Sequence, residues 1–261
     1  MNIVVCIKQV PDTTEIKIDP KTNTLIREGV ESILNPFDLY ALEEALRLKE
    51  RFAAKVSVIS MGPPQVESAL RESVAMGADY IYLLSDRRFA GADTLATSLT
   101  LATAIKKILK DELFLVLFGQ QAIDGDTAQV GPGTATLLNY PQTCFVSKIV
   151  KIEEKSITVK RLMEDGYDQI KMPIPCVLSV VKEINEPRLA SLRGRRNAKK
   201  AKLKILNADD LGLDEKVVGL NGSPTQVVEI FTPKMDKRVE KHEVDTESAV
   251  EILHKKIKSM L

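Results

Sequence analysis

Residues 113–132 read LFLVLFGQQAIDGDTAQVGP: an apolar run, then a turn rich in Gly, Asp and Thr, then the start of a segment of small residues. An apolar run of this length is typical of a strand that is buried on both faces. A buried strand that ends in such a turn presents main-chain N–H groups to phosphate where the next helix begins. The stretch therefore predicts a nucleotide site at the carboxyl end of a parallel strand.

Single residues of this turn have expected roles. Glycines such as Gly119 and Gly125 let the main chain approach a ligand closely. Asp126 or Thr127 is expected to cap the following helix, and Asp124 to accept a hydrogen bond from a ribose hydroxyl. The stretch has neither a Walker lysine nor the Gly-x-Gly-x-x-Gly spacing, so an ordinary capped strand-to-helix turn stays open as an alternative.

Similar apolar runs alternate with helical patterns along the first half of the chain. Strands are expected at residues 3–7, 55–60, 80–84 and 113–118. Apolar residues spaced by three and four predict helices near 37–52, 66–74 and 95–109. The alternation predicts an α/β fold with a mostly parallel, Rossmann-like sheet, helices on both faces and ligands at the carboxyl ends of the strands.

The expected helix starts carry capping residues at the same edge of the sheet. Residues 35–38 (NPFD) supply an N-cap asparagine, a proline suited to the first helical position and a negative charge in the first turn. Asp93 is expected to cap the helix that follows it, which leaves Thr94 and Thr97 free to face a ligand. Loops that gather in this way at one edge favour a binding site there.

The pattern changes after residue 143. Residues 146–152 and 156–161 predict a β-hairpin with one solvated face, and residues 175–181 a returning strand. Residues 188–204 are rich in Lys and Arg and contain no acidic residue, which predicts a solvated basic loop. An RNA-binding arm stays open for this stretch, although it has no aromatic residue on which bases could stack. A helix is expected near residues 247–260.

These patterns divide the chain into three parts. Residues 1–185 are expected to form a nucleotide-binding α/β domain with a β-hairpin. Residues 186–204 are expected to form a basic partner-recognition loop, and residues 205–261 a C-terminal arm and helix that wraps a partner or the body of the chain.

Composition limits the class of protein. The 37 Lys and Arg nearly cancel the 36 Asp and Glu, so no overall field favours nucleic acid or an anionic membrane. Cys6, Cys144 and Cys176 form no C-x-x-C motif, which argues against a zinc site or disulfide framework and for a reducing compartment. No apolar run approaches the roughly 18 residues of a membrane span. We therefore expect a cytoplasmic protein without membrane insertion, bound metal or nucleic acid.

Six motifs resemble, in order along the chain, the beta subunit of electron-transfer flavoproteins. They are residues 4–12 (VVCIKQVPD), 35–38 (NPFD), 61–64 (MGPP), 76–79 (MGAD), 121–126 (QAIDGD) and 186–188 (EPR). The match covers almost the whole chain. In that family a nucleotide lies in the beta subunit against loops that correspond to several of these motifs.

The resemblance, together with the expected start of the third helix, gives a set of cofactor-binding residues. The set is Cys6, Asn35, Pro36, Phe37, Asp38, Met61, Asp93, Thr94, Thr97, Gly119, Gln120, Gln121, Ala122, Asp124, Gly125, Asp126, Thr127, Ala128, Gln129 and Val130. No side chain of the set is expected to act as a catalytic acid, base or nucleophile.

Two branches of the family differ in the nucleotide. The mitochondrial-type branch holds structural AMP and has acidic residues and Cys-Asn where this chain has GDTA at residues 125–128. Residues 91–97 (GADTLAT) and 222–227 (GSPTQV) instead resemble the electron-bifurcating branch, in which a second FAD replaces AMP. Hydroxyls of the first segment suit a ribityl chain, and a helix that begins at Thr127 suits a pyrophosphate. FAD is the prediction and AMP the alternative.

The bifurcating branch implies a route for electrons. NADH would deliver hydride to the flavin of this chain. One electron would then pass through the FAD of the alpha subunit to an acyl-CoA dehydrogenase-like partner, and the other to ferredoxin or flavodoxin. Since the chemistry belongs to the cofactor, the resemblance implies an electron-transfer subunit rather than an autonomous enzyme.

The resemblance also implies a surface for the dehydrogenase. Leu192 corresponds to a leucine that fills an apolar pocket of the partner, and Arg188, Arg193 and Arg195 supply flanking positive charge. A simple electron carrier that holds AMP stays open as an alternative. A remote alternative is an ATP-using α/β enzyme in which Asp124 and Asp126 bind a metal.

Overall fold

The structure is a computed structural model that describes residues 2–12, 32–109, 113–228 and 240–259. The chain divides into two compact units, residues 1–228 and residues 229–261. The first unit contains the sheets and their covering helices. In the second unit, the described residues include the helix α7 (Thr246–Lys258), whose first turn is capped by Asp245.

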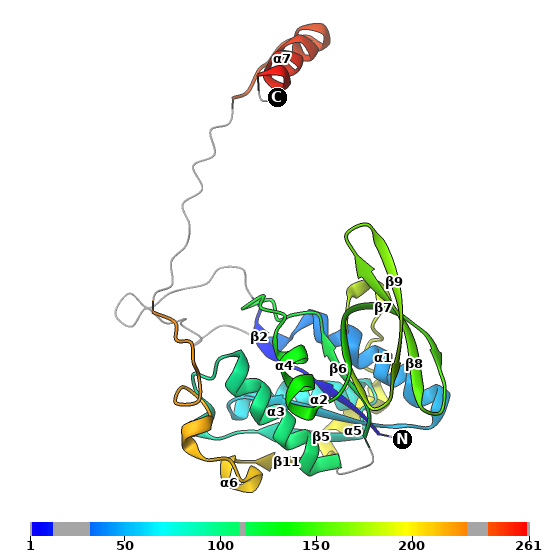
Figure 1. The fold of residues 1–261 in the computed structure, drawn as a ribbon, viewed down its shortest axis with the longest axis vertical. Coiled ribbons are helices and arrows are strands. Elements are labelled where there is room, and N and C mark those ends of the chain that lie inside the picture. Colours follow the sequence, from blue (N-terminus) through cyan, green and yellow to red (C-terminus); the bar gives the residue numbers. More distant parts are fainter. Residues whose placement is uncertain (1, 13–31, 110–112, 229–239, 260–261) are drawn as a thin grey trace. The chain divides into compact units, whose positions relative to one another are not determined.

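The described residues form a nine-stranded sheet in the order β11-β5-β4-β1-β6-β10-β7-β8-β9 (Figure 1). The strands are β1 (Asn2–Cys6), β4 (Lys55–Met61), β5 (Tyr80–Leu84), β6 (Leu113–Gly119), β7 (Gln142–Ile152), β8 (Ser156–Met163), β9 (Gly166–Pro173), β10 (Cys176–Val180) and β11 (Leu203–Leu206). Pairing is parallel from β11 to β7, whereas β7, β8 and β9 pair antiparallel. The expected mostly parallel α/β sheet is therefore confirmed.

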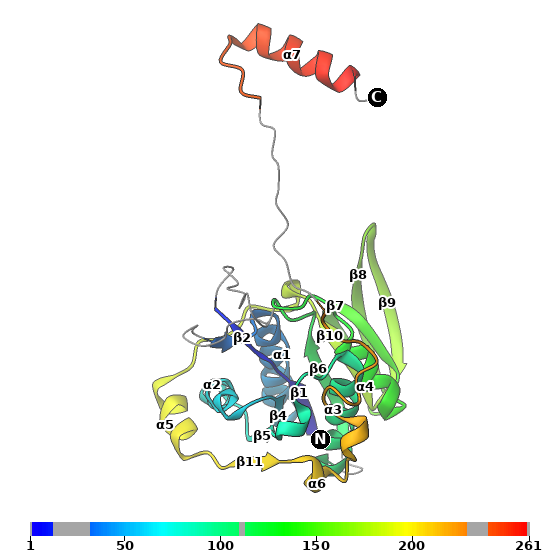
Figure 2. The same cartoon turned by 90° about the vertical axis from the view of Figure 1, so that its left-hand side faces the viewer.

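Helices cover both faces of this sheet. On one face lie α1 (Pro36–Phe52), α2 (Glu67–Met76) and α5 (Leu192–Lys200), and on the other α3 (Thr94–Leu109), α4 (Val130–Leu138) and α6 (Ala208–Leu211) (Figure 2). Strand β1 serves both layers, because Ile3 and Val5 belong to the first apolar core while Val4 and Cys6 belong to the second. This alternation explains why the strand is apolar at every position.

The expected strands and helices agree with the structure to within a few residues, and the returning strand β10 is also confirmed. Four short or polar strands were missed, one of which, β11, lies at the end of the basic stretch. Strands β2 (Gln9–Pro11) and β3 (Ser32–Leu34) form a small antiparallel pair, and β9 adds a third strand to the expected hairpin. In β9 the buried or half-buried positions are few, so its alternation is too weak to be recognised from sequence.

The basic stretch was wrongly expected to be a loop along its whole length. Its middle is the helix α5, capped by the Ser191 side chain, and its end is the strand β11, which pairs in parallel with β5. Only Ala198 of α5 is buried, and the helix has few apolar residues from which it could be recognised. Tertiary contacts with α2 therefore decide a structure that the charge pattern conceals.

In the described parts of the chain, no helix combines the length and the apolar character needed to cross a membrane. The expected division into three segments stays a prediction. Strand β11 and helix α6 belong to the same compact unit as the parallel strands.

Candidate nucleotide-binding site

The site lies where the order of the sheet reverses. After β1 the chain passes through α1 to β4 on one side of β1, whereas β6 pairs with the opposite side. Because β1, β4 and β6 are parallel, their carboxyl ends share one edge. Ligands of open α/β sheets bind in the crevice outside the strand ends at such a reversal.

The buried carboxylate of Asp38 joins the ends of β1 and β6. It accepts hydrogen bonds from the main-chain N–H of Lys8, at 2.7 Å, and of Gly119, at 3.2 Å. A Cβ atom at Gly119 would lie 2.4 Å from Asp38 Oδ1 and 2.6 Å from the carbonyl carbon of Phe37. Residue 119 must therefore be glycine for the first turn of α1 to approach the end of β6.

Asn35 is the N-cap residue of α1, as expected, but its side chain does not bond the first turn of the helix. Instead the amide Nδ2 donates to the carbonyl of Gln121 at 2.8 Å, and Oδ1 accepts from the N–H of Ile123 at 3.3 Å. Asn35 thus ties the start of α1 to the turn after β6, while Pro36 occupies the first helical turn as expected.

Two polar contacts shape the turn after β6. Lys8 Nζ donates to Asp124 Oδ1 at 2.7 Å, and Gln121 Nε2 donates to Asp126 Oδ1 at 2.8 Å. Sequence reasoning missed Lys8, although it lies within the quoted motif 4–12. One carboxylate oxygen of Asp124 therefore already accepts a hydrogen bond from another residue of this chain.

Helix α4 begins later than expected. Its first residue is Val130, and its N-cap Gln129 makes no side-chain cap, so neither Asp126 nor Thr127 caps this helix. Asp126 and Ala128 have left-handed φ angles of 51° and 54°, which keep the preceding chain out of the helix.

The delayed helix start leaves main-chain donors unpaired. Within the described part of the chain, the N–H groups of Thr127, Ala128 and Gln129 have no hydrogen-bond partner. Consecutive N–H groups in alternating left- and right-handed conformations form an anion-binding concavity. The residues present therefore fit a nucleotide phosphate.

The start of α3 forms the neighbouring wall. Asp93 Oδ1 accepts from the N–H groups of Leu95 and Ala96, at 2.9 and 3.0 Å, so the expected cap is confirmed. Thr94 Oγ1 donates to Gln129 Oε1 at 3.1 Å, which links α3 to the loop before α4. Among the described residues no group bonds the hydroxyl of Thr97.

The segment 222–227 also reaches this wall. The N–H and hydroxyl of Thr225 donate to Asp93 Oδ2, at 3.1 and 2.8 Å, and Asp93 N–H donates to Ser223 Oγ. The sequence predicts no such contact, because a separation of about 130 residues leaves no local signal.

The remaining predicted residues fall into two groups. Cys6 is buried at the end of β1, where burial raises the pKa of its thiol, and Met61 ends the neighbouring strand β4. Arg188, Leu192, Arg193 and Arg195 belong to the segment on the α1 and α2 side of the sheet. The structure thus brings together the predicted loops and keeps the basic residues as a separate surface.

Comparison with known proteins agrees with this architecture. Residues 22–211 match the family model described as electron transfer flavoprotein domain. The chain belongs to the electron transfer flavoprotein family. The expected resemblance to its beta subunits is also confirmed, and with it a role in electron transfer.

Three relatives illustrate the similarity. An electron transfer flavoprotein subunit beta of Thermoanaerobacterium thermosaccharolyticum is 53% identical over 99% of this chain and 98% of its own length. The caffeyl-CoA reductase-Etf complex subunit CarD of Acetobacterium woodii is 56% identical over 89% and 88%. The protein FixA of Azotobacter vinelandii is 45% identical over 96% and 92%.

The two glycines of the β6 turn should respond differently to substitution. We expect Gly119→Ala to lower the free energy of unfolding by about 1–3 kcal/mol, because its Cβ would displace Asp38 or Phe37. A Cβ at Gly125 would meet no atom within 4 Å, so Gly125→Ala is the control and should change stability by less than about 0.5 kcal/mol. Denaturant unfolding measures both, and equal losses would contradict the close approach at Gly119.

Asp38 should make stability depend on pH. Burial is the largest influence and raises its pKa from 3.8 to about 7, against hydrogen bonds from Lys8, Asn35 and Gly119 that lower it. The folded protein therefore retains a proton that the unfolded chain has already lost, so the contribution of Asp38 to stability falls as the pH rises from about 4 to about 7. Above that pH the contribution is constant.

The matched variant is Asp38→Asn, which keeps the shape and cannot ionise. Between about pH 4 and 7 the unfolding free energy of the wild type should fall relative to that of the variant, by an amount on the order of a few kcal/mol. Parallel pH profiles for the two proteins would contradict the assignment.

Proposed function

We propose that this chain is the nucleotide-binding beta subunit of a heterodimeric, electron-bifurcating electron-transfer flavoprotein, and that it holds FAD at the edge formed by β1, β4 and β6. In this proposal NADH supplies a hydride to that FAD. One electron passes through the FAD of the alpha subunit to an acyl-CoA dehydrogenase-like enzyme, and the other goes to ferredoxin or flavodoxin.

The observation that carries the proposal is the row of main-chain N–H groups at Thr127, Ala128 and Gln129, which bond no other described residue. These donors lie directly before α4, whose dipole adds partial positive charge. Three N–H groups suit the phosphate oxygens of either FAD or AMP, so the choice of FAD rests on the resemblance of residues 91–97 and 222–227 to the bifurcating branch. Similarity to a subunit named for a caffeyl-CoA reductase-Etf complex supports a partner enzyme that acts on a CoA ester.

FAD, when bound, supplies the hydride and one-electron chemistry. The residues of this chain bind and orient it. The N–H groups before α4 bind phosphate oxygens, and the hydroxyl of Thr97 is available to the polyol chain. Asp38 and Asn35 hold the loops at fixed separation. None of these groups has to give or take a proton.

The nucleotide content of the heterodimer tests the cofactor proposal. Purified alpha–beta heterodimer, denatured to release its nucleotides, should yield two FAD and no AMP per heterodimer when separated by chromatography. The alpha chain expressed alone is the control and should yield no more than one FAD. One FAD with one AMP would overturn the FAD assignment in favour of a simple electron carrier.

A second surface suits the dehydrogenase partner. Leu189 and Leu192 are 94% and 85% exposed, which is unusual for leucine on a described, well-anchored segment. The side chains of Arg193 and Arg195 form no ion pair with any described residue. An apolar anchor beside unpaired cations fits a partner with an apolar pocket rimmed by carboxylates.

Truncation of the anchor tests this surface. We expect Leu192→Ala to slow the reduction of a purified acyl-CoA dehydrogenase by at least about tenfold, because a buried hot-spot contact is lost. Nucleotide content should not change. Ile205→Ala, which truncates a 58% exposed side chain on the neighbouring strand β11, is the control and should behave as wild type. Lost nucleotide in Leu192→Ala would contradict the separation of the two sites.

A further inference from the structure

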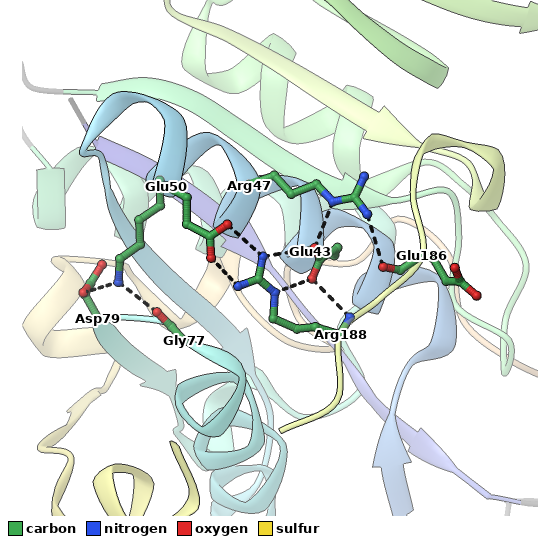
Figure 3. A network of polar contacts seen from close by, with 8 residues as sticks. Glu43, Arg47, Glu50, Gly77, Asp79, Glu186 and Arg188 are labelled. Atoms are coloured by element: carbon green, nitrogen blue, oxygen red, sulfur yellow. Dashed lines mark hydrogen bonds and ion pairs between the residues drawn. The ribbon is translucent and has the colours of Figure 1, made fainter. Parts of the chain in front are cut away.

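The segment that carries Leu189 and Leu192 is exposed, yet an ion pair with a buried glutamate fixes it to the body of the protein. Its anchor is Arg188, which the sequence suggested as a direct contact with the partner. The Arg188 side chain points instead toward α1, where it meets Glu43 and Glu50 (Figure 3).

The contact between Arg188 and Glu43 is extensive. Glu43 Oε2 accepts from Arg188 Nε at 2.7 Å and from its main-chain N–H at 3.2 Å, while Oε1 accepts from Arg188 Nη2 at 3.1 Å. Arg188 Nη1 and Nη2 also donate to the carboxylate of Glu50. All three guanidinium nitrogens are thus used within the chain.

The environments of the two glutamates differ. The Glu43 side chain is 4% exposed, whereas that of Glu50 is 62% exposed. Burial raises the pKa of Glu43, but hydrogen bonds from Arg188 and Arg47 outweigh it and hold the pKa below its ordinary value. Glu43 is therefore a buried, ionised carboxylate whose main partner is Arg188. A pair of this kind is costly to break because one charge is left without compensation.

Neighbouring contacts fix the chain on both sides of Arg188. Upstream, Asn185 Nδ2 donates to the carbonyl of Tyr40 at 3.0 Å and to Glu44 Oε2 at 3.1 Å, so α1 holds this part too. Downstream, a Cβ at Gly194 would lie 1.9 Å from the carbonyl oxygen of Ala75, so α5 presses directly on the end of α2. Between these points Leu189 and Leu192 stay exposed.

We propose that Glu43 is a positioning residue for partner docking: through Arg188 it holds residues 186–192 in one conformation, so that Leu189 and Leu192 are presented already ordered. The inference rests on the proposed docking surface. Its physical basis is preorganisation, since a segment that is ordered before contact loses less conformational entropy when the partner binds.

The experiment compares Glu43→Gln with wild type in the alpha–beta heterodimer. Amide hydrogen exchange at residues 186–192 should become at least about tenfold faster, because the neutral amide cannot compensate the guanidinium. With a purified acyl-CoA dehydrogenase as acceptor, KM should rise about five- to tenfold while kcat stays unchanged. Nucleotide content should equal that of wild type.

Two further variants make the test specific. Arg188→Lys keeps the charge but not the forked geometry of the guanidinium. Its hydrogen-exchange rate at residues 186–192 and its KM should lie between those of wild type and Glu43→Gln. If Glu43→Gln fails to fold, the same two measurements on Arg188→Lys replace it. Glu153→Gln is the matched control, because Glu153 pairs with Lys151 and Lys171 on the β7–β9 extension, and neither readout should move.

The outcomes separate the inference from the proposed function. Unchanged exchange at residues 186–192 in Glu43→Gln, or a fall in kcat without a rise in KM, would overturn the positioning role. If Leu192→Ala still raises KM in that case, the docking surface stands and only the role of Glu43 fails. If Leu192→Ala has no effect, the docking surface itself is wrong.

Discussion

The candidate site depends on one buried carboxylate. Asp38 accepts N–H groups from the residues that follow β1 and end β6, and so joins the two strands at which the sheet order reverses. Its partner position must be Gly119, because any side chain there would collide with Asp38 or Phe37. Beside this junction the loops also contact one another directly, through Lys8 with Asp124 and Asn35 with residues 121 and 123.

Helix α1 connects the two surfaces that the protein is proposed to use. Its first turn supplies Asp38 to the nucleotide edge, while Glu43, Glu44 and Glu50 on later turns hold the segment around Arg188. Because a helix of 17 residues is stiff over this length, it sets the separation between the nucleotide loops and the exposed leucines.

Local sequence patterns were sufficient to predict the central strands of the sheet but not its edge strands β9 and β11. Strands β1, β4, β5 and β6 are apolar on both faces and could be recognised at once, and Asp93 was correctly identified as a cap because a cap is a local contact. Asn35 occupies the N-cap position of α1 but makes no side-chain cap, and neither Asp126 nor Thr127 caps α4, because distant contacts and local backbone geometry decide these positions. The side chain of Asn35 bonds residues more than 80 positions away, and the left-handed residues at 126 and 128 delay α4 to Val130.

Local sequence patterns were enough to predict the α/β class, the family and the loops at the carboxyl edge, since periodicity, turn residues and ordered motifs are carried by neighbouring positions. Three features could be seen only in the folded chain: the N–H groups of residues 127–129 that bond no other described residue, the pair of Lys8 with Asp124, and the contact of Arg188 with Glu43. These are contacts between distant segments, and their energies depend on burial and geometry that no local window of sequence contains.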